Sequence, residues 1–109
     1  MAPLPPAPIA DLDLETVRDG LARGRVLLVD VREPHEFAAG HIPGSVSLPL
    51  SVFDPGLIAP DAGQRVVFSC AAGVRSVRAI ELARAAGLDW NEHYKGGFKE
   101  WALAGEPIA

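Results

Sequence analysis

The chain has 109 residues, of which 49% are hydrophobic, and its 10 Lys and Arg against 14 Asp and Glu give a net charge of −4. This length predicts one domain with its own core, and the hydrophobic content argues against disorder. The mild acidity argues against a nucleic-acid partner, and no apolar run approaches the roughly 20 residues of a membrane helix.

The N-terminus is rich in proline. Residues 1–8 include four prolines, which predicts an extended arm followed by a single domain over residues 9–109. The same stretch lacks the basic and apolar regions of a signal peptide, so we expect a cytoplasmic protein and no membrane partner. The alanine-rich composition, with more arginine than lysine, suggests a bacterial source.

The chain has a single cysteine, Cys70, which excludes an internal disulfide and any multi-cysteine metal site. Its three histidines have no companions at metal-ligand spacing. We therefore expect neither a metal nor a cofactor.

In chain order, the first predicted elements are a helix, a strand and a second helix. Apolar residues recur at helical spacing over 14–21, directly after Asp13, a residue type that caps helix starts. The unbroken apolar run at 26–29 predicts a buried parallel strand. Pro34 suits the first position of a helix and begins a short predicted one over 34–38.

The second half of the chain continues this alternation. A short strand is predicted over 45–48, and residues 49–63 form a loop rich in proline and glycine. The apolar run at 66–68 predicts a second buried strand. The remaining predicted elements are a helix over 77–86, a short edge strand over 90–94 and a helix over 98–103.

Strands that alternate with helices predict an α/β fold with a mostly parallel sheet. Ligands of such sheets bind beyond the carboxyl ends of the strands. Two places meet that condition. Asp30 and Arg32 follow the strand at 26–29, and Cys70 follows the strand at 66–68.

Cys70 stands between a predicted strand and a predicted helix, and the six residues after it contain no proline. Their backbone N–H groups can therefore converge on one point, toward which the following helix also directs its positive end. A thiolate is favoured at such a point, so we expect the pKa of Cys70 to lie below about 8.5. The loop residues are Ala71, Ala72, Gly73, Val74, Arg75 and Ser76.

Several side chains of this loop have an expected task. The small residues Ala71, Ala72 and Gly73 leave room for a substrate, and Gly73 also permits a tight turn. Arg75 adds positive charge, and Ser76 is expected to cap the helix. The alternative interpretation is that the cysteine is an inert buried thiol, as free cysteines often are.

The chain resembles the single-domain rhodaneses of the thiosulfate sulfurtransferase family. The resemblance rests on LLVDVREPHEF at 27–37, GHIPGSVSLP at 40–49, VVFSCAAGVRS at 66–76 and YKGGFKEWALAGEP at 94–107. It implies a central mostly parallel sheet flanked by helices on both faces. It also implies a sulfurtransferase that moves a sulfane sulfur from thiosulfate or a persulfide donor to cyanide or a thiol.

Under this resemblance, Cys70 is the nucleophile and carries the sulfur as a persulfide, which the amides of residues 71–76 stabilise. Arg75 either holds the loop or binds an anionic donor. Because the chain has no second thiol, the acceptor comes from outside: cyanide, a small thiol or a cysteine of a partner protein. The alternative is a non-catalytic or sulfur-carrier module that docks on a partner, but the intact Cys70, Gly73 and Arg75 favour the enzyme.

Loop length separates this chemistry from that of cysteine-dependent phosphatases. Only four residues lie between Cys70 and Arg75, whereas such phosphatases use a longer Cys-x5-Arg loop around a larger phosphoryl group. The chain also departs from the resemblance: Ala71 and Ala72 stand where some rhodaneses have a basic side chain, and Glu36 lies where some have an arginine. Fewer cations predict weak binding of doubly charged thiosulfate.

The other polar candidates are interpreted as structural. Asp30 and Arg32 are expected to brace the fold through polar contacts. His41 is expected to hydrogen-bond the backbone beside a turn, and His35 and His93 are expected at the surface.

Overall fold

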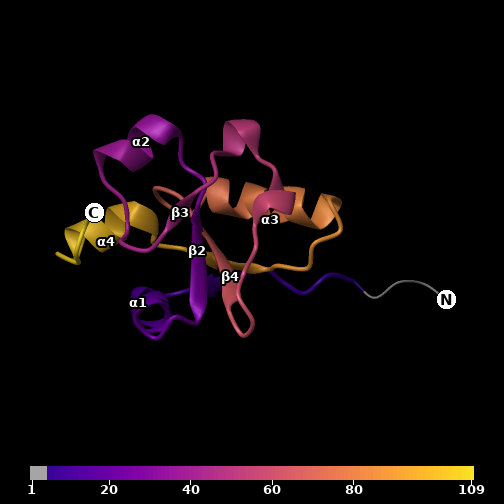
Figure 1. Cartoon of the computed structure of the whole chain (residues 1–109), viewed down its shortest axis with the longest axis horizontal. Coiled ribbons are helices and arrows are strands. Elements are labelled where there is room, and N and C mark those ends of the chain that lie inside the picture. Colours follow the sequence, from indigo (N-terminus) through magenta and orange to yellow (C-terminus); the bar gives the residue numbers. More distant parts are fainter. Residues whose placement is uncertain (1–4) are drawn as a thin grey trace.

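The computed structural model describes residues 5–109 and contains one sheet of five strands in the order β1-β5-β4-β2-β3. Every neighbouring pair is parallel, which confirms the predicted α/β class with a mostly parallel sheet (Figure 1). The strands are β1 (Ala10–Leu12), β2 (Val26–Asp30), β3 (Val46–Ser47), β4 (Arg65–Ser69) and β5 (Glu92–Tyr94).

The helices begin where local chemistry favours a start. The Asp13 carboxylate accepts a hydrogen bond from the Thr16 amide at 2.9 Å, which satisfies a free donor in the first turn of α1. Pro34 occupies the first position of α2, as predicted. The helices are α1 (Leu14–Ala22), α2 (Pro34–Ala39), α3 (Arg75–Ala85) and α4 (Gly97–Leu103), with two 3₁₀ turns, η1 (Leu50–Val52) and η2 (Pro55–Leu57).

Helices cover both faces of the sheet, as the resemblance implied (Figure 1). Because side chains alternate along a strand, Val29 and Leu28 of β2 enter different apolar clusters. Val29 packs with Ile80 of α3, whereas Leu28 lies in the cluster of α1 and α4 that includes Trp101. Cys70 belongs to the cluster on the α3 face.

The strand predicted over 90–94 is present as β5, but the prediction that it lies at an edge of the sheet was wrong. Residues 10–12, which carried no strand prediction, form β1 and pair with β5, so β5 lies between β1 and β4. A three-residue strand has too few residues to display an alternating pattern, and its partner lies far along the chain. His93 and Tyr94 of β5 are both buried, whereas Glu92 is partly exposed.

The prolines at 5, 6 and 8 lie at the start of the described residues, whereas Pro3 and the rest of 1–4 lie outside them. The Pro8 carbonyl accepts a hydrogen bond from Asn91 Nδ2 at 2.9 Å, and the Ala7 carbonyl accepts one from Arg84. The division into an arm over 1–8 and a domain over 9–109 stays a prediction.

The central strands carry the candidate residues to the same edge of the sheet. Asp30, the last residue of β2, pairs with Ser69, the last residue of β4, and the Val31 amide donates to the Ser69 carbonyl at 2.8 Å. Arg32 and Cys70 therefore follow strands that end side by side. No helix in residues 5–109 is long and apolar enough to cross a membrane.

Candidate active site

Backbone amides surround the sulfur of Cys70. The Gly73 amide donates a hydrogen bond to Cys70 Sγ at 3.1 Å. The amides of Ala72 and Ser76 are oriented so that they also lower the pKa of this thiol. The Ser76 hydroxyl oxygen lies 3.5 Å from the same atom. The loop thus directs several donors at one sulfur, which is the arrangement that an anion requires.

Two opposing effects set the pKa of Cys70. Burial is the largest effect and raises the pKa, because the charged thiolate is poorly solvated. In the thiolate form, hydrogen bonds from the Ser76 hydroxyl and from the amides of Ser76, Ala72 and Gly73 together outweigh it, so the pKa lies below its ordinary value of 9.0. The direction agrees with the expectation from the sequence.

The start of α4 orients the amides of the cysteine loop, which comprises residues 70–76. The Phe98 amide donates to the Cys70 carbonyl at 2.9 Å, and the Lys99 amide donates to the Ala71 carbonyl at 3.0 Å. In a trans peptide the N–H points opposite to the C=O, so the amides of Ala71 and Ala72 point away from α4. Helix α4 is therefore part of the support that turns the Ala72 amide toward the sulfur.

Two glycines allow the cysteine loop and the turn before α4 to approach closely. Gly73 has φ +80°, and a Cβ there would lie 2.3 Å from the Lys95 carbonyl oxygen. Gly97 has φ +65°, and a Cβ there would lie 2.5 Å from the Ala71 carbonyl oxygen. Both positions require a residue without a side chain, for conformation and for space.

Arg75, the first residue of α3, forms a bidentate ion pair with Glu36 of α2. Its Nη1 and Nη2 atoms lie 2.7 and 3.0 Å from the two carboxylate oxygens. The hydrogen bonds from Arg75 lower the pKa of Glu36 to about 2. Arg75 thereby ties the loop to α2, and Glu36 offsets its charge, a pairing that the sequence analysis did not foresee.

The expectation that Ser76 caps a helix was wrong. Helix α3 begins one residue earlier, its cap position is Val74, and no side chain caps it. Ser76 lies inside the first turn and is fully buried, with its hydroxyl oxygen 2.8 Å from Nδ1 of His93. Its side chain therefore contacts Cys70 of the cysteine loop and His93 of β5.

The expectation that His93 lies at the surface was also wrong. Its exposed fraction is 2%, and its ring lies between Ser76 of α3 and Asp11 of β1, the strand that pairs with β5. Its Nε2 atom lies 2.7 Å from the Asp11 carboxylate of β1. No local pattern marks this contact, since 82 positions separate the two residues. His35, by contrast, is exposed as expected.

Asp30 and Arg32 face each other at the end of β2. The Arg32 Nε and Nη2 atoms lie 3.0 and 2.8 Å from Asp30 Oδ2, and Nη2 also donates to the Gly40 carbonyl at 2.8 Å. The guanidinium carbon lies 4.3 Å above the centre of the Phe98 ring. This buried pair joins β2, the end of α2 and α4 behind the cysteine loop.

His41 contacts the backbone and an aromatic ring. Its Nδ1 atom lies 3.0 Å from the Phe37 carbonyl oxygen, and its ring stacks on that of Phe37 with centroids 3.8 Å apart. The backbone of His41 also exchanges hydrogen bonds with Ala109. These contacts hold the turn after α2 against the C-terminus.

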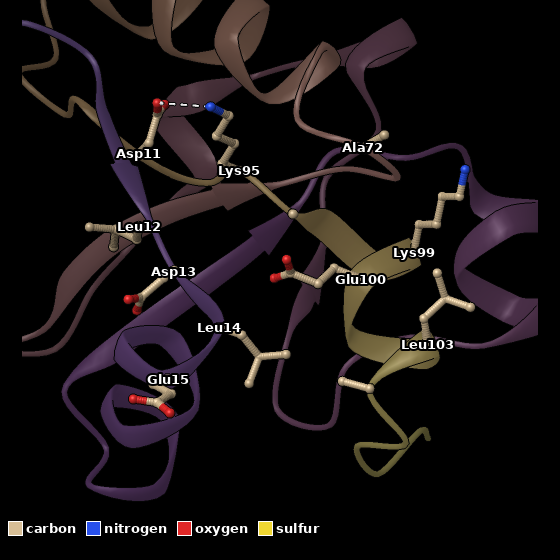
Figure 2. A pocket seen from close by; sticks show the side chains of 12 residues that line it. Asp11, Leu12, Asp13, Leu14, Glu15, Ala72, Lys95, Lys99, Glu100 and Leu103 are labelled. Carbon is tan, nitrogen blue, oxygen red and sulfur yellow. Dashed lines mark ion pairs between the residues drawn. The ribbon is translucent and has the colours of Figure 1, made fainter.

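The sulfur is less accessible than the small loop residues suggested. The exposed fraction of Cys70 is 1%, although Ala72 and Val74 are exposed around it. An open groove of about 1190 Å³ borders the loop at Ala72, and the cysteine does not line it. Figure 2 shows the groove between the start of α1 and α4, with Asp11 and Lys95 at one end.

Metal ligation is a separate question from thiol chemistry. Over the described part of the chain, no three His, Cys, Asp or Glu side chains are grouped as a metal site would need.

The fold and the loop together define an α/β domain with a cysteine-containing loop at the carboxyl ends of its parallel strands. Residues 13–104 match the family described as the rhodanese-like domain. The chain belongs to this family.

Several relatives have sequences or structures similar to this chain. The human thiosulfate:glutathione sulfurtransferase is 36% identical over 104 residues, which cover 83% of this chain and 90% of the human one. An uncharacterised Synechocystis protein is 42% identical over 82 residues, covering 75% of this chain and 46% of its own length. The chain thus spans about half of the cyanobacterial relative.

The solved structure of a human single-domain sulfurtransferase superposes with a TM-score of 0.71 at 32% identity. The match covers 85% of this chain and 95% of the human chain. The family and its fold are therefore shared along nearly the whole domain.

Proposed function

We propose that this protein is a sulfurtransferase in which Cys70 carries the transferred sulfur. In the first step, the Cys70 thiolate attacks the outer sulfur of the donor and the S–S bond of the donor breaks. With thiosulfate, sulfite leaves with the bonding electron pair, and the cysteine keeps the sulfur as a persulfide anion. In the second step, an acceptor takes the outer sulfur and the Cys70 thiolate returns.

The observation that carries this proposal is the hydrogen bond from the Gly73 amide to Cys70 Sγ at 3.1 Å, in a loop whose Ala72 and Ser76 amides also lower the pKa of the thiol. Fixed N–H dipoles stabilise a charged sulfur without reorganising during the reaction. We propose that the same loop amides stabilise the terminal sulfur of a persulfide anion. The lowered pKa of Cys70 supports the proposal because the thiolate is the nucleophile.

We propose thiosulfate or a persulfide as the donor, and cyanide or a thiol as the acceptor. The name of the human relative pairs thiosulfate with glutathione, which supports a thiol acceptor here. Glu36 offsets the charge of Arg75, so few free cations face the loop, and weak thiosulfate binding stays our prediction. A thiosulfate KM in the micromolar range would contradict it.

Two alternatives remain to be tested against this proposal. A non-catalytic module that only docks on a partner needs no reactive thiol, whereas Cys70 has several donors at its sulfur. A sulfur-carrier module would share the Cys70 persulfide and differ in needing a partner protein for transfer. A phosphatase needs a loop that encloses a phosphoryl group, whereas the loop from Cys70 to Arg75 is short and closes on the sulfur itself.

The deciding experiment weighs the protein after reaction. The chain is incubated with thiosulfate or an organic persulfide, desalted, and analysed by intact-mass spectrometry. We expect the mass of one added sulfur atom in the wild type and in His35→Ala, an exposed control, and no addition in Cys70→Ala. Absence of the adduct with both donors would reject the proposal, and hydrolysis of an aryl phosphate would favour the phosphatase.

A further inference from the structure

A chain of hydrogen-bonding side chains leads from the Cys70 sulfur to the surface. The Ser76 hydroxyl oxygen lies 3.5 Å from Cys70 Sγ and 2.8 Å from His93 Nδ1. On the other side of the imidazole ring, Nε2 lies 2.7 Å from an Asp11 carboxylate oxygen. The first three residues are buried, whereas the Asp11 side chain is 53% exposed. This series of hydrogen-bonded side chains therefore connects a buried thiol to solvent.

The four side chains come from four different segments of the fold. Cys70 follows β4, Ser76 lies in α3, His93 in β5 and Asp11 in β1. Asp11 lines the groove beside the loop, where Lys95 Nζ lies 3.7 Å from its other carboxylate oxygen (Figure 2). The outer end of the chain thus opens into the groove that borders Ala72.

The hydrogen-bond partners of His93 determine which of its two ring nitrogens carries a proton. A carboxylate only accepts, so Nε2 of His93 donates its proton to Asp11. The hydrogen bond from His93 is the main reason that the pKa of Asp11 lies below its ordinary value, which keeps this carboxylate ionised. In neutral His93, Nδ1 then accepts the Ser76 hydroxyl proton, and the hydroxyl oxygen is free to accept the thiol proton.

We propose that His93 receives the proton of the Cys70 thiol through Ser76, and that Asp11 stabilises the resulting imidazolium. The thiol proton passes to the Ser76 oxygen while the hydroxyl proton of Ser76 passes to Nδ1. The products are a thiolate, an intact serine hydroxyl and an imidazolium, and no electron is transferred. This proposal rests on the proposed function, since it explains how a buried thiol becomes the nucleophile.

The charged groups around this chain are few. Asp11 and, beyond it, Lys95 face the imidazole end. On the thiol side, Arg75 interacts electrostatically with Cys70 and is paired with Glu36. Asp30, which also acts on Arg75, is paired with Arg32. Because these two pairs are internally compensated, removal of the imidazolium is expected to change the thiol pKa measurably.

His93 touches no substrate, so it is a positioning residue that acts through Ser76. Its test is the pH profile of Cys70 alkylation by iodoacetamide, followed by intact mass, which reports the thiolate without any sulfur donor. In His93→Asn, the amide can still hydrogen-bond Ser76 but cannot take a proton. We expect the midpoint of the profile to rise by about one pH unit or more.

Three further variants sharpen this test. Asp11→Asn keeps the hydrogen-bond acceptor but removes the charge, and we expect a smaller rise in the midpoint. Ser76→Ala breaks the relay, so the double variant with His93→Asn is expected to shift no further than Ser76→Ala alone. His35→Asn, at an exposed histidine of α2, is the matched control and is expected to leave the midpoint unchanged.

An unchanged midpoint in His93→Asn, with the near-UV circular dichroism of the folded protein retained, would overturn the proposal and leave His93 a structural link. If that variant fails to fold, the alkylation midpoint of Asp11→Asn is the test, because the Asp11 side chain is half-exposed. An unchanged midpoint in Asp11→Asn would then overturn the proposal. Failure of the proposed function is distinguishable: the wild type would gain no sulfur from any donor, although the alkylation profiles would still differ between variants.

Discussion

At the scale of single residues, Gly73 is the position of the cysteine loop where a side chain is accommodated least well. Its positive φ disfavours other residues, and the Lys95 carbonyl oxygen occupies the space that a Cβ would need. Gly87 has a similar φ of +86° but no atom within 4 Å of a Cβ. Replacing each glycine by alanine therefore distinguishes two costs. At Gly87 only the backbone conformation is unfavourable, whereas at Gly73 the added Cβ also overlaps a neighbouring carbonyl oxygen.

We predict that Gly73→Ala lowers the free energy of unfolding by about 2–4 kcal/mol, because strain and overlap add. Gly87→Ala is expected to cost only about 1 kcal/mol. Urea denaturation at neutral pH measures both losses. Equal losses in the two variants would show that the contact with the Lys95 carbonyl carries no cost.

At the scale of elements, the ion pair between Glu36 of α2 and Arg75 of α3 links two helices that flank the cysteine loop. Sequence reasoning identified both residues but not their pairing, because 39 positions separate them and no local pattern joins them. It also left open whether Arg75 holds the loop or binds a donor. The bidentate contact with Glu36 favours the first of these roles.

The pKa of Glu36 falls from an ordinary 4.5 to about 2 in the folded protein. Its stabilising effect is therefore complete above pH 4.5 and is lost as the pH falls toward 2. Because the side chain is 27% exposed, we predict that Glu36→Gln lowers the neutral-pH unfolding free energy by roughly 1–2 kcal/mol.

The measurement compares denaturant unfolding of the wild type and Glu36→Gln at pH 7 and near pH 3. The difference between them is expected to shrink at the lower pH, where Glu36 begins to protonate. Glu81→Gln, in the exposed pair with Arg78, is the control and is expected to have little effect at either pH. A difference that persists undiminished near pH 2 would contradict the assigned cause.

At the scale of the whole molecule, the chain has one thiol, and its sulfur is 1% exposed. No second cysteine can discharge a persulfide within the chain. We predict that the desalted persulfide persists in buffer and is lost within one turnover when glutathione or cyanide is added. Intact mass against time measures this, and rapid spontaneous loss in thiol-free buffer would count against it.

The amino-acid sequence by itself determined the parallel α/β class, the central strands and the loop with Cys70, Gly73 and Arg75. These depend on local spacing and on the conformations that proline and glycine allow, so they are visible in the order of residues. Only the tertiary structure decided that β1 pairs with β5 and that His93 and Ser76 lie beside the thiol. Such contacts join segments far apart in the chain, and sheet pairing and packing alone bring them together.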